Sequence, residues 1–234
     1  EIVKTFILNF LKKKYPAVKF ILDYQPKSIE RKEILRRIMN YVSACRIEGD
    51  YLEFGVYKGS TFIEAYKMAK AKKLRSMKFF AFDSFEGLPE ISKEENIPVS
   101  FEQFRKGQYS FSRENFRKNL ERADVSMADV KIVPGWFDKV LNEDTKNKIG
   151  LGPIAVAWVD GDLYESAVSV LDFIRDHIVD GTVLVFDNWF FFRGSPFRGE
   201  QRAFREWLRR NPDLSFSEFH KYFWHGNSFI IHKN

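Results

Sequence analysis

The sequence of 234 residues predicts an α/β fold, in which helices cover both faces of a mostly parallel, seven-stranded sheet that ends in an antiparallel hairpin. Three observations predict this fold. Short apolar segments alternate with longer segments of helical periodicity from residue 51 to residue 210. The short segments are apolar almost throughout, as expected of parallel strands buried on both sides. Two more strand-like segments then close the chain.

The predicted elements follow one another in a regular order. Five short apolar runs are predicted as strands, at residues 51–56, 78–83, 131–133, 154–159 and 182–186. Helical spacing of apolar residues predicts helices at residues 62–72, 112–123, 166–178 and 200–210. Ser60 and Thr61 are expected to provide the N-cap of the first helix. The terminal hairpin is predicted at residues 216–223 and 228–232.

The remaining segments are predicted to be less regular or separate. Residues 84–111 are rich in Gly, Pro, Ser and charged residues, which predicts a long loop. Residues 1–47 are expected to form an N-terminal helical extension to a domain of residues 48–234. Arg31, Lys32, Arg36 and Arg37 are expected to coat the outside of these N-terminal helices.

Composition excludes several classes of site. The single cysteine, Cys45, excludes an intrachain disulfide and cysteine-rich zinc sites. A single cysteine also fits a reducing compartment, so we expect the protein in the cytoplasm. No apolar run approaches the roughly 20 residues of a membrane-spanning helix. The four histidines have no metal-binding spacing, and no role is predicted for them.

The charge is distributed unevenly along the chain. A net charge of +6 raises nucleic acid or an anionic membrane surface as a partner. Residues 1–49 carry +6 and residues 189–234 carry +4, whereas residues 50–188 carry −4. Because the motifs described below lie in the acidic middle, we expect no nucleic-acid partner. Peripheral membrane contact through the basic N-terminal helices stays open, and we expect a homo-oligomer.

Acidic residues or glycines end each of the five parallel strands. These residues are Gly55, Asp83, Gly135, Asp160 and Asp187. Doubly wound sheets bind their ligands at the carboxyl ends of the strands, near the point where the strand order reverses. The pattern therefore predicts a binding site at this edge of the sheet.

The first strand continues into a glycine-containing loop. Residues 53–61 read Glu-Phe-Gly-Val-Tyr-Lys-Gly-Ser-Thr, which is neither a dinucleotide-binding nor a nucleoside-triphosphate loop. The Glu53 carboxylate would repel a pyrophosphate but suits a ligand with an ammonium or sulfonium group. Asp83 follows Gly59 by 24 residues, a separation at which such folds hold ribose hydroxyls. The alternatives are a plain turn and a solvated strand-end aspartate.

A second acidic group follows the fourth and fifth strands. Asp160, Asp162 and Glu165 come after the fourth strand, and Asp187 and Asn188 follow the fifth. Carboxylate and amide oxygens suit a hard cation such as Mg²⁺ or Ca²⁺. The alternative is that one of Asp160 and Asp162 caps the following helix.

Several of these segments together resemble a known family. Residues 82–89 read Phe-Asp-Ser-Phe-Glu-Gly-Leu-Pro, and residues 160–166 read Asp-Gly-Asp-Leu-Tyr-Glu-Ser. With residues 52–61, Gly-Trp-Phe at residues 135–137 and Asp187, they make residues 48–205 similar to class I S-adenosylmethionine-dependent methyltransferases, specifically the macrocin O-methyltransferase (TylF/MycF) family. The resemblance implies a Rossmann-like fold and methylation of a hydroxyl group on a sugar, glycoside or related small molecule.

The resemblance also implies roles for individual residues. The S-adenosylmethionine site would comprise Glu53, Gly55, Val56, Tyr57, Gly59, Ser60, Thr61, Asp83, Ser84, Phe85, Gly135, Trp136 and Asp160. Asp160, Asp187 and Asn188 match the family's Mg²⁺ ligands. The family usually has aspartate at the last position, so Asn188 is expected to weaken metal binding. Asp160 is the predicted catalytic base, because a carboxylate at the metal accepts the proton of the hydroxyl.

Three alternative functions remain open. A nucleic-acid methyltransferase fits the basic charge, but residues 187–190 (Asp-Asn-Trp-Phe) lack the Asn/Asp-Pro-Pro-Tyr signature of base amino-methylation. A nicotinamide dehydrogenase fits the fold, but the phosphate-binding glycines are missing and Glu53 is unfavourable. A non-catalytic S-adenosylmethionine-binding module is conceivable because of Asn188. Phe190, Phe191 and Phe192 are predicted either to wall an acceptor pocket or to pack in the core.

Overall fold

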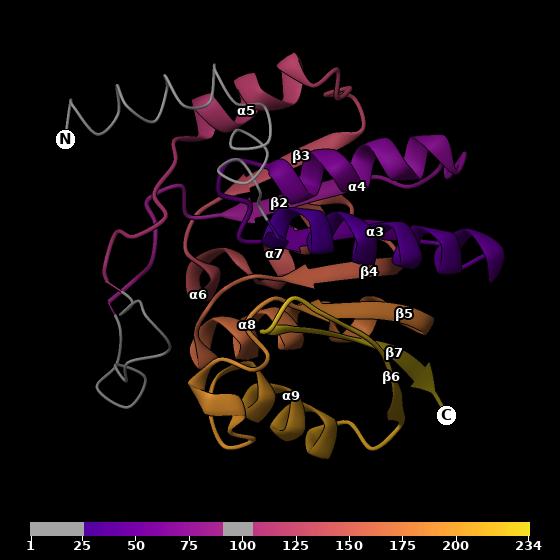
Figure 1. The fold of residues 1–234 in the computed structure, drawn as a ribbon, viewed down its shortest axis with the longest axis vertical. Helices are drawn as coiled ribbons and strands as arrows, with labels where there is room; N and C mark the ends of the chain where they lie inside the picture. Colours follow the sequence, from indigo (N-terminus) through magenta and orange to yellow (C-terminus); the bar gives the residue numbers. More distant parts are fainter. Residues whose placement is uncertain (1–25, 91–104) are drawn as a thin grey trace, which may run out of the picture.

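A seven-stranded sheet organises the computed structural model, which describes residues 26–90 and 105–234 (Figure 1). The strands are β1 (Asp50–Phe54), β2 (Phe79–Asp83), β3 (Val130–Pro134), β4 (Ile154–Val159), β5 (Ile178–Phe186), β6 (Leu214–Tyr222) and β7 (Gly226–Lys233). Their order is β3-β2-β1-β4-β5-β7-β6. Neighbours from β3 to β5 are parallel, and β7 is antiparallel to both β5 and β6. The predicted fold is confirmed.

The helices connect and cover these strands. They are α3 (Pro26–Ala44), α4 (Ser60–Ala71), α5 (Arg113–Arg122), α6 (Phe137–Val140), α7 (Glu143–Ile149), α8 (Tyr164–Ile174) and α9 (Gly199–Arg210). Two 3₁₀ turns, η1 (Arg175–His177) and η2 (Phe192–Gly194), follow α8 and precede α9. Residues 1–25 of the predicted N-terminal extension and residues 91–104 of the predicted loop lie outside the described residues.

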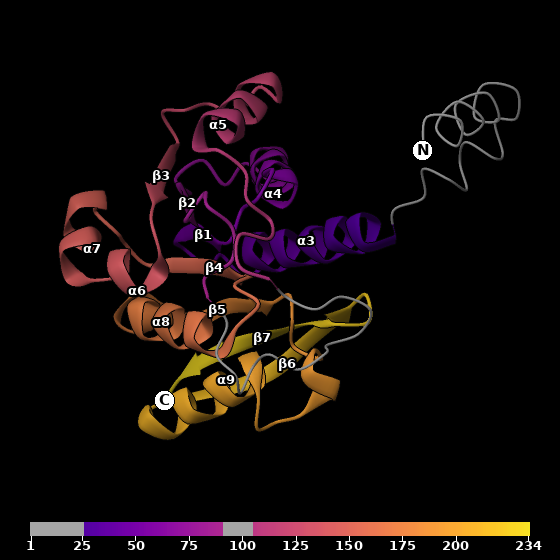
Figure 2. The same cartoon turned by 90° about the vertical axis from the view of Figure 1, so that its left-hand side faces the viewer.

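Alternating side chains of the strands build two hydrophobic clusters, one on each face. Phe79 and Ala81 of β2 pack in a cluster with α3, α4 and α5, whereas Phe80 and Phe82 pack in a cluster with α8 and α9. Figure 2 shows α3, α4 and α5 on one side of the sheet and α6, α7 and α8 on the other. Because both faces are covered, the strands are apolar nearly throughout, as the sequence predicted.

Helix α3 packs on the body of the fold through one apolar stripe. Leu35, Ile38, Met39 and Val42 are fully buried and share a cluster with β1 and α4. Their spacing of three and four residues places them on one helix face. The boundary predicted at residue 48 therefore falls after a helix that belongs to the common core. Among the described residues, no helix has the length and apolarity needed to cross a bilayer.

Local corrections concern the ends of helices. Gly59, with φ +85°, is the N-cap of α4 and provides no side-chain cap, so the predicted capping by Ser60 or Thr61 is wrong. The left-handed backbone of Gly59 lets the helix begin at Ser60, two residues before the predicted start at residue 62. Leu163 is the N-cap of α8, so neither Asp160 nor Asp162 caps that helix. The sequence predicted no helix in residues 137–149, where the short α6 and α7 lie.

Candidate active site

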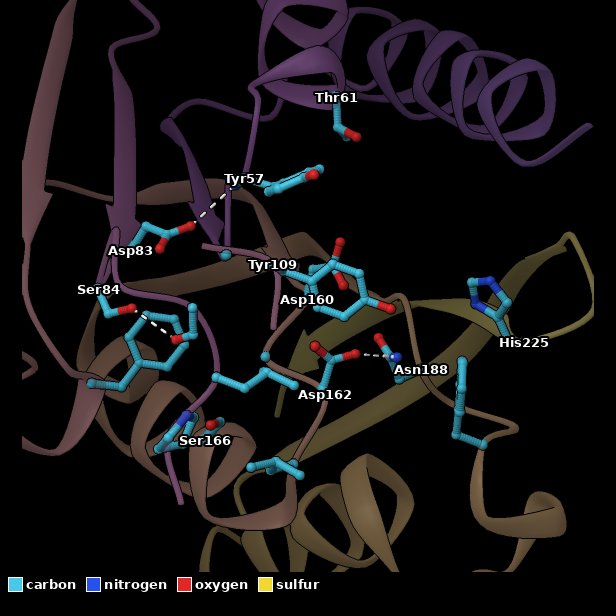
Figure 3. Close-up of a pocket in the computed structure, with 18 of the residues that line it drawn as sticks. Tyr57, Thr61, Asp83, Ser84, Tyr109, Asp160, Asp162, Ser166, Asn188 and His225 are labelled. Atoms are coloured by element: carbon cyan, nitrogen blue, oxygen red, sulfur yellow. Dashed lines mark hydrogen bonds between the residues drawn. The ribbon is translucent and has the colours of Figure 1, made fainter. Parts of the chain in front are cut away.

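A cleft of about 1470 Å³ opens at the carboxyl ends of the parallel strands. Its lining includes Gly55 after β1, Asp83 at the end of β2, Asp160 after β4 and Asn188 after β5. His225 joins them because β7 runs antiparallel and begins at the same edge. In Figure 3, Asp83 and His225 lie on opposite sides of the cleft, with Asp160 and Asn188 between them. Strand-end residues therefore meet where the topology predicts a ligand site.

The loop after β1 requires glycine for steric reasons. Gly55 has φ +89°, and a Cβ atom there would lie 2.1 Å from the carbonyl oxygen of Asp160. At Gly59 a Cβ atom would lie 2.7 Å from the ring of Phe116. The two glycines thus let the loop run close to β4 and α5 while Tyr57, Ser60 and Thr61 line the cleft.

Asp83 holds this loop through its side chain. Its Oδ2 atom accepts hydrogen bonds from the backbone N–H groups of Val56 (2.9 Å) and Tyr57 (3.0 Å). Its Oδ1 atom accepts one from the N–H of Phe85 at 2.7 Å. An ionised carboxylate has about four lone-pair positions, so three N–H groups leave capacity for a ligand hydroxyl. Asp83 therefore fastens two loops together at the edge of the cleft.

Glu53 lies beneath the cleft and not in its lining. Its side chain is 2% exposed and accepts a hydrogen bond of 2.5 Å from the hydroxyl of Tyr51. Burial raises the pKa of Glu53 from 4.5 to about 8, although the hydrogen bond and Arg31 act in the opposite direction. At neutral pH the folded protein thus favours the protonated carboxyl group. This buried position differs from the ligand-facing position that the sequence predicted.

The cofactor residues predicted from the sequence divide into two groups. Those that line the cleft are Gly55, Tyr57, Ser60, Thr61, Asp83, Ser84, Gly135, Trp136 and Asp160. Those that lie outside its lining are Glu53, Val56, Gly59 and Phe85. Val56 and Phe85 are instead buried in the hydrophobic cluster beside α4 and α5, and their backbone N–H groups reach Asp83. Val56 and Phe85 therefore support the loops after β1 and β2 and do not line the cleft.

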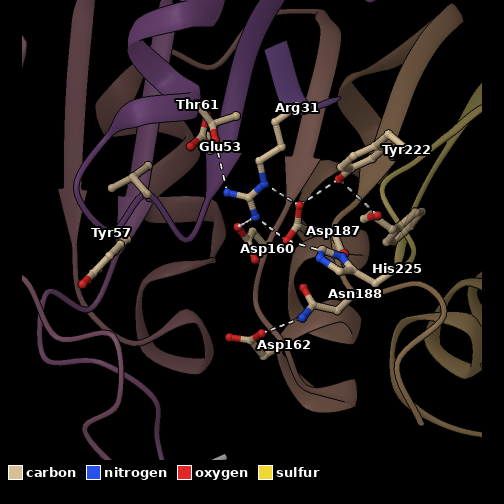
Figure 4. Close-up of polar contacts among 12 residues, drawn as sticks. Arg31, Glu53, Tyr57, Thr61, Asp160, Asp162, Asp187, Asn188, Tyr222 and His225 are labelled. Carbon is tan, nitrogen blue, oxygen red and sulfur yellow. Dashed lines mark hydrogen bonds and ion pairs between the residues drawn. The ribbon is translucent and has the colours of Figure 1, made fainter. Parts of the chain in front are cut away.

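Arg31 of α3 lies between the two carboxylates that were predicted to bind a metal (Figure 4). Its Nε donates to Oδ1 of Asp187 at 2.8 Å, and its Nη2 donates to Oδ2 of Asp160 at 2.7 Å and to Oδ2 of Asp187. Its Nη1 donates to the hydroxyl of Thr61 at 3.3 Å. Burial lowers the pKa of Arg31, but the charges of Asp187 and Asp160 outweigh burial and keep the guanidinium protonated.

Tyr222 and His225 complete the surroundings of Asp187. The Tyr222 hydroxyl donates to Oδ1 of Asp187 at 2.9 Å, and Nδ1 of His225 contacts the backbone carbonyl oxygen of the same residue. Burial, followed by the charge of Asp187, raises the pKa of Tyr222 well above its ordinary value. Asp187 itself is fully buried, so the side chains around it, and not water, compensate its charge.

The side chain of Asn188 forms a hydrogen bond with a carboxylate, whereas the sequence predicted that it would bind a metal ion. Its Nδ2 donates to Oδ1 of Asp162 at 2.7 Å, and its backbone N–H donates to the buried carboxyl of Glu200 at 2.9 Å. Its Oδ1 atom is buried and has no hydrogen-bond partner among the described residues. Burial raises the pKa of Glu200 well above its ordinary value, which favours the neutral acid.

The predicted metal ligands do not fit a divalent cation in this arrangement. Both oxygens of Asp187 and one oxygen of Asp160 already accept hydrogen bonds from Arg31. Within residues 26–90 and 105–234, no group of three or more His, Cys, Asp or Glu side chains could hold a metal ion. A dication at the same place would also lie against the fixed positive charge of Arg31.

Sequence reasoning missed Arg31. The predicted place on the outer coat of the helix is right for Arg36 and Arg37, whose side chains are about half exposed and pair with Glu33, and wrong for Arg31. Arg31 lies four residues before Leu35 and so on the buried stripe of α3. A basic residue on an apolar stripe, in a chain whose middle is acidic, was the available signal.

Two other predictions about aromatic and histidine residues have clear outcomes. Phe191 lines the cleft, whereas Phe192 is buried with Leu88 and Leu163. Phe192 therefore packs in the interior, whereas a role of Phe191 in an acceptor pocket stays a prediction. His225, for which no role was predicted, is 2% exposed and lines the cleft.

Comparison with known proteins yields a family and several relatives. The family model of macrocin-O-methyltransferase (TylF) matches residues 27–216. An 8-demethyl-8-(2,3-dimethoxy-alpha-L-rhamnosyl)-tetracenomycin-C 4'-O-methyltransferase from Streptomyces olivaceus is 24% identical over 209 residues, which cover 81% of this chain and 78% of that protein. A demethyldecarbamoylnovobiocin O-methyltransferase from Streptomyces niveus is 27% identical over 164 residues, covering 69% of this chain and 60% of that protein.

Solved structures agree with the observed fold. The structure of the O-methyltransferase NovP superimposes with a TM-score of 0.70 at 23% sequence identity, covering 86% of this chain and 79% of that chain. At this identity the likeness is one of fold. The matched family model begins at residue 27 and so includes helix α3, which carries Arg31.

Proposed function

The chain belongs to the macrocin-O-methyltransferase (TylF) family, and from this premise we propose that it methylates a hydroxyl group of a sugar within a small glycoside. As a family member it is an S-adenosylmethionine-dependent O-methyltransferase. The names of the two relatives above, which specify a rhamnosyl tetracenomycin and a novobiocin derivative, support a glycoside as the acceptor.

One observation carries the proposal: Asp160 lies between two chemically different ends of a single cleft (Figure 3). The end near Asp83 offers a glycine loop and a carboxylate, which suit a ribose-bearing cofactor. The end near His225 offers aromatic side chains, which suit an acceptor. An acceptor oxygen and a methyl donor that bind at the two ends would meet beside Asp160.

The proposed cofactor site uses the residues of the Asp83 end. Asp83 would accept hydrogen bonds from the ribose hydroxyls, and Gly55 and Thr61 would adjoin the methionine part. Gly135 and Trp136 would face the adenine. Gly135 supports this, because its backbone N–H donates to the carbonyl oxygen of Asp83 at 2.9 Å, which brings the two segments together.

The proposed acceptor site lies among the aromatic rings near His225. Phe191 and Trp224 line the cleft with ring centroids 5.0 Å apart, and both rings contact the ring of His225. Aromatic rings beside the polar side chains of the cleft suit a ligand that has both apolar and hydroxyl-bearing parts. A glycoside has both.

The proposed reaction is an in-line displacement at the methyl carbon of the sulfonium. As the acceptor oxygen bonds to the methyl carbon, the carbon–sulfur bond breaks and its electron pair stays on sulfur. The acceptor proton moves to the Asp160 carboxylate, which acts as general base. Alignment of the two reactants supplies several kcal/mol, up to about 7–11 in ideal cases. The chain thus contributes alignment and one proton acceptor.

The test is a methyl-transfer assay with labelled S-adenosylmethionine over a panel of sugars, glycosides, phenols, DNA and RNA. We expect label in a glycoside and micromolar binding of S-adenosylmethionine by calorimetry. Asp160→Asn, which keeps the size of the side chain, should lower kcat by about 100-fold or more, the usual contribution of a general base, and should change the Kd of S-adenosylmethionine far less. Label in nucleic acid alone, or cofactor binding without turnover of any acceptor, would contradict the proposal.

The assembly and cellular location complete the proposal. A homo-oligomer in the cytoplasm remains our prediction from the sequence. Light scattering coupled to size exclusion will measure the mass against the 27.7 kDa of one chain. Cell fractionation with a tagged chain will test the location.

A further inference from the structure

We propose that Arg31 is the resident cation of this active site, so that its guanidinium holds Asp160 and Asp187 in position and methyl transfer proceeds without a divalent metal. This inference rests on the proposed function for its catalytic consequence, although its metal-binding consequence can be tested alone. It assigns to α3 a part of the active site that the strand-end motifs do not contain.

The first step is that two carboxylates lie next to each other by topology. Val159 and Phe186 are paired in the parallel register of β4 and β5, and Asp160 and Asp187 are the residues that follow them. Asp187 is fully buried and the Asp160 side chain is 21% exposed. Two such carboxylates repel each other, and one would take up a proton unless a cation lies between them.

The second step is that Arg31 supplies this cation with a matching shape. Its Nε and Nη2 form a fork onto the two oxygens of Asp187, and Nη2 also reaches Oδ2 of Asp160 at 2.7 Å. A planar guanidinium binds a carboxylate by two parallel hydrogen bonds, which fixes orientation as well as charge. Nη1 is bonded to Thr61, and the guanidinium carbon lies 5.9 Å from the ring centroid of Trp158.

Helix α3 is itself fixed on the fold by contacts on either side of Arg31 in the sequence, so the position of Arg31 is fixed as well. Leu35 and Ile38 fix the helix in the core next to α4. The adjacent Glu30 accepts a hydrogen bond from the backbone N–H of Phe223, in the turn that joins β6 and β7. Arg31 therefore extends from a helix that is packed into the core. Its own side chain is only 17% exposed.

Asn188, the third predicted ligand, adds no negative charge to the site. Its Nδ2 donates to Asp162, and although its buried Oδ1 has no hydrogen-bond partner among the described residues, one neutral oxygen does not offset the positive charge of Arg31. With Arg31 present, the site already has one cation against Asp160 and Asp187. Arg31 therefore acts as a positioning residue: it orients Asp160 toward the acceptor without itself touching the reacting atoms.

The first experiment measures metal binding directly, with Mn²⁺ as a paramagnetic probe for electron paramagnetic resonance. We expect the wild-type protein to bind no Mn²⁺ at concentrations up to about 1 mM. Because this measurement needs no acceptor, it can be read even if the proposed function fails. Stoichiometric Mn²⁺ binding by the wild-type protein that Asp187→Asn abolishes would overturn the inference.

The second experiment compares Arg31→Ala with Arg36→Ala, a matched control on the exposed face of the same helix. Arg31→Ala should lower kcat by about 100-fold, the loss typical of a mispositioned catalytic group, with little change in the Kd of S-adenosylmethionine. Added guanidinium ion should restore part of the activity, and Mn²⁺ should now bind. Arg36→Ala should match the wild type in all three measurements.

Arg31→Lys keeps the protein measurable if the alanine variant does not fold. Lysine keeps the charge but cannot form the fork, so kcat should fall between those of the wild type and Arg31→Ala, and Mn²⁺ should still not bind. Wild-type turnover should be unchanged by excess EDTA or by millimolar Mg²⁺. Loss of turnover in EDTA that Mg²⁺ restores, or full activity of Arg31→Lys in the absence of its fork, would contradict the inference.

Discussion

Four buried or half-buried carboxyl groups near the cleft differ in their hydrogen-bond partners, and these partners set their chemistry. Asp83 accepts three backbone N–H groups. Asp187 pairs with Arg31 and Tyr222. Glu53 and Glu200 are buried and form no ion pair with another described residue, and burial raises the pKa of each. The same chemical group thus has three roles: Asp83 holds a loop, Asp187 forms an ion pair, and Glu53 and Glu200 are buried acids that favour the neutral form.

Asp83→Asn should weaken cofactor binding. The amide nitrogen would face a backbone N–H group that the carboxylate now satisfies, and a charged hydrogen bond is worth about 1.5–3 kcal/mol. We expect the Kd of S-adenosylmethionine to rise by about 10- to 100-fold in calorimetry. Asp172→Asn, an exposed carboxylate on α8 that pairs with Arg210, is the control and should bind the cofactor as the wild type does. Equal affinities in both variants would contradict the role of Asp83.

Glu53→Gln should change how stability depends on pH. Between pH 4.5 and about 8 the folded state keeps a proton on Glu53 that the unfolded state loses, so the contribution of Glu53 to stability falls as pH rises through this window. Glutamine carries no such proton, so the free energy of unfolding of Glu53→Gln relative to the wild type should increase toward pH 8.

Urea denaturation at pH 5 and pH 8.5 will measure this effect. Each unit of pKa shift corresponds to about 1.4 kcal/mol, so we expect a change of a few kcal/mol between the two conditions. Glu48→Gln, at an exposed position just before β1, is the matched control and should show a much smaller change. A difference for Glu53→Gln that stays constant with pH would show that the buried carboxyl group does not titrate in this range.

Among the elements of the fold, the loop after β1 requires glycine at residue 55 for a steric reason. Gly55 and Gly150 both have positive φ, +89° and +60°, but only Gly55 lies against another strand. A Cβ atom at Gly55 would collide with the backbone of Asp160, whereas no atom of the described part of the chain lies within 4 Å of one at Gly150. Alanine at Gly150 therefore tests the strain of left-handed backbone alone, whereas alanine at Gly55 tests that strain together with a steric collision.

Gly150→Ala should cost about 1 kcal/mol, because left-handed backbone is strained for alanine. Gly55→Ala should cost clearly more, about 3 kcal/mol or above, because the loop must move away from β4. It should also abolish binding of S-adenosylmethionine, while Gly150→Ala should bind normally. Chemical denaturation and calorimetry will measure both effects. Normal cofactor binding by Gly55→Ala would show that the loop tolerates displacement.

The elements were predictable where their signal is local. The strand segments rest on short apolar runs. Ser112 is the N-cap of α5, and its hydroxyl accepts a hydrogen bond from the N–H of Asn115. Helix ends were less predictable, because the left-handed backbone of Gly59 and the N-cap at Leu163 depend on how the strand enters the helix. The short α6 and α7 were missed because one or two turns contain too little periodicity.

In the molecule as a whole, segments that are distant in sequence form ion pairs with each other and pack in one hydrophobic core. The basic N-terminal segment supplies Arg31 to carboxylates in the acidic middle, 129 and 156 residues away. The apolar stripe of α3 joins the core formed by β1 and α4. The excess of positive charge that first suggested nucleic acid thus includes one charge that lies among the carboxylates of the candidate active site.

A chain of residues 48–234 should not fold stably. Its loss of α3 would expose the apolar cluster that Leu35, Ile38 and Met39 now cover. Each such side chain contributes about 1.5–3 kcal/mol by burial, and a domain has only about 5–15 kcal/mol in total. Thermal unfolding and dye binding will compare it with the full chain, and Leu35→Ala in the full chain should show an intermediate loss. A cooperative transition at the wild-type temperature would support residues 1–47 as a separate extension.

The sequence by itself determined the order of strands and helices, the edge of the sheet where the site lies, and the family, because these depend on local apolar periodicity and on short motifs at strand ends. Only the tertiary structure decided what surrounds Asp160 and Asp187. The position of Arg31 depends on how α3 packs against α4, and its contacts join residues that no local pattern relates. The sequence indicated acidic groups in need of a cation, and the packing of a distant helix provides one.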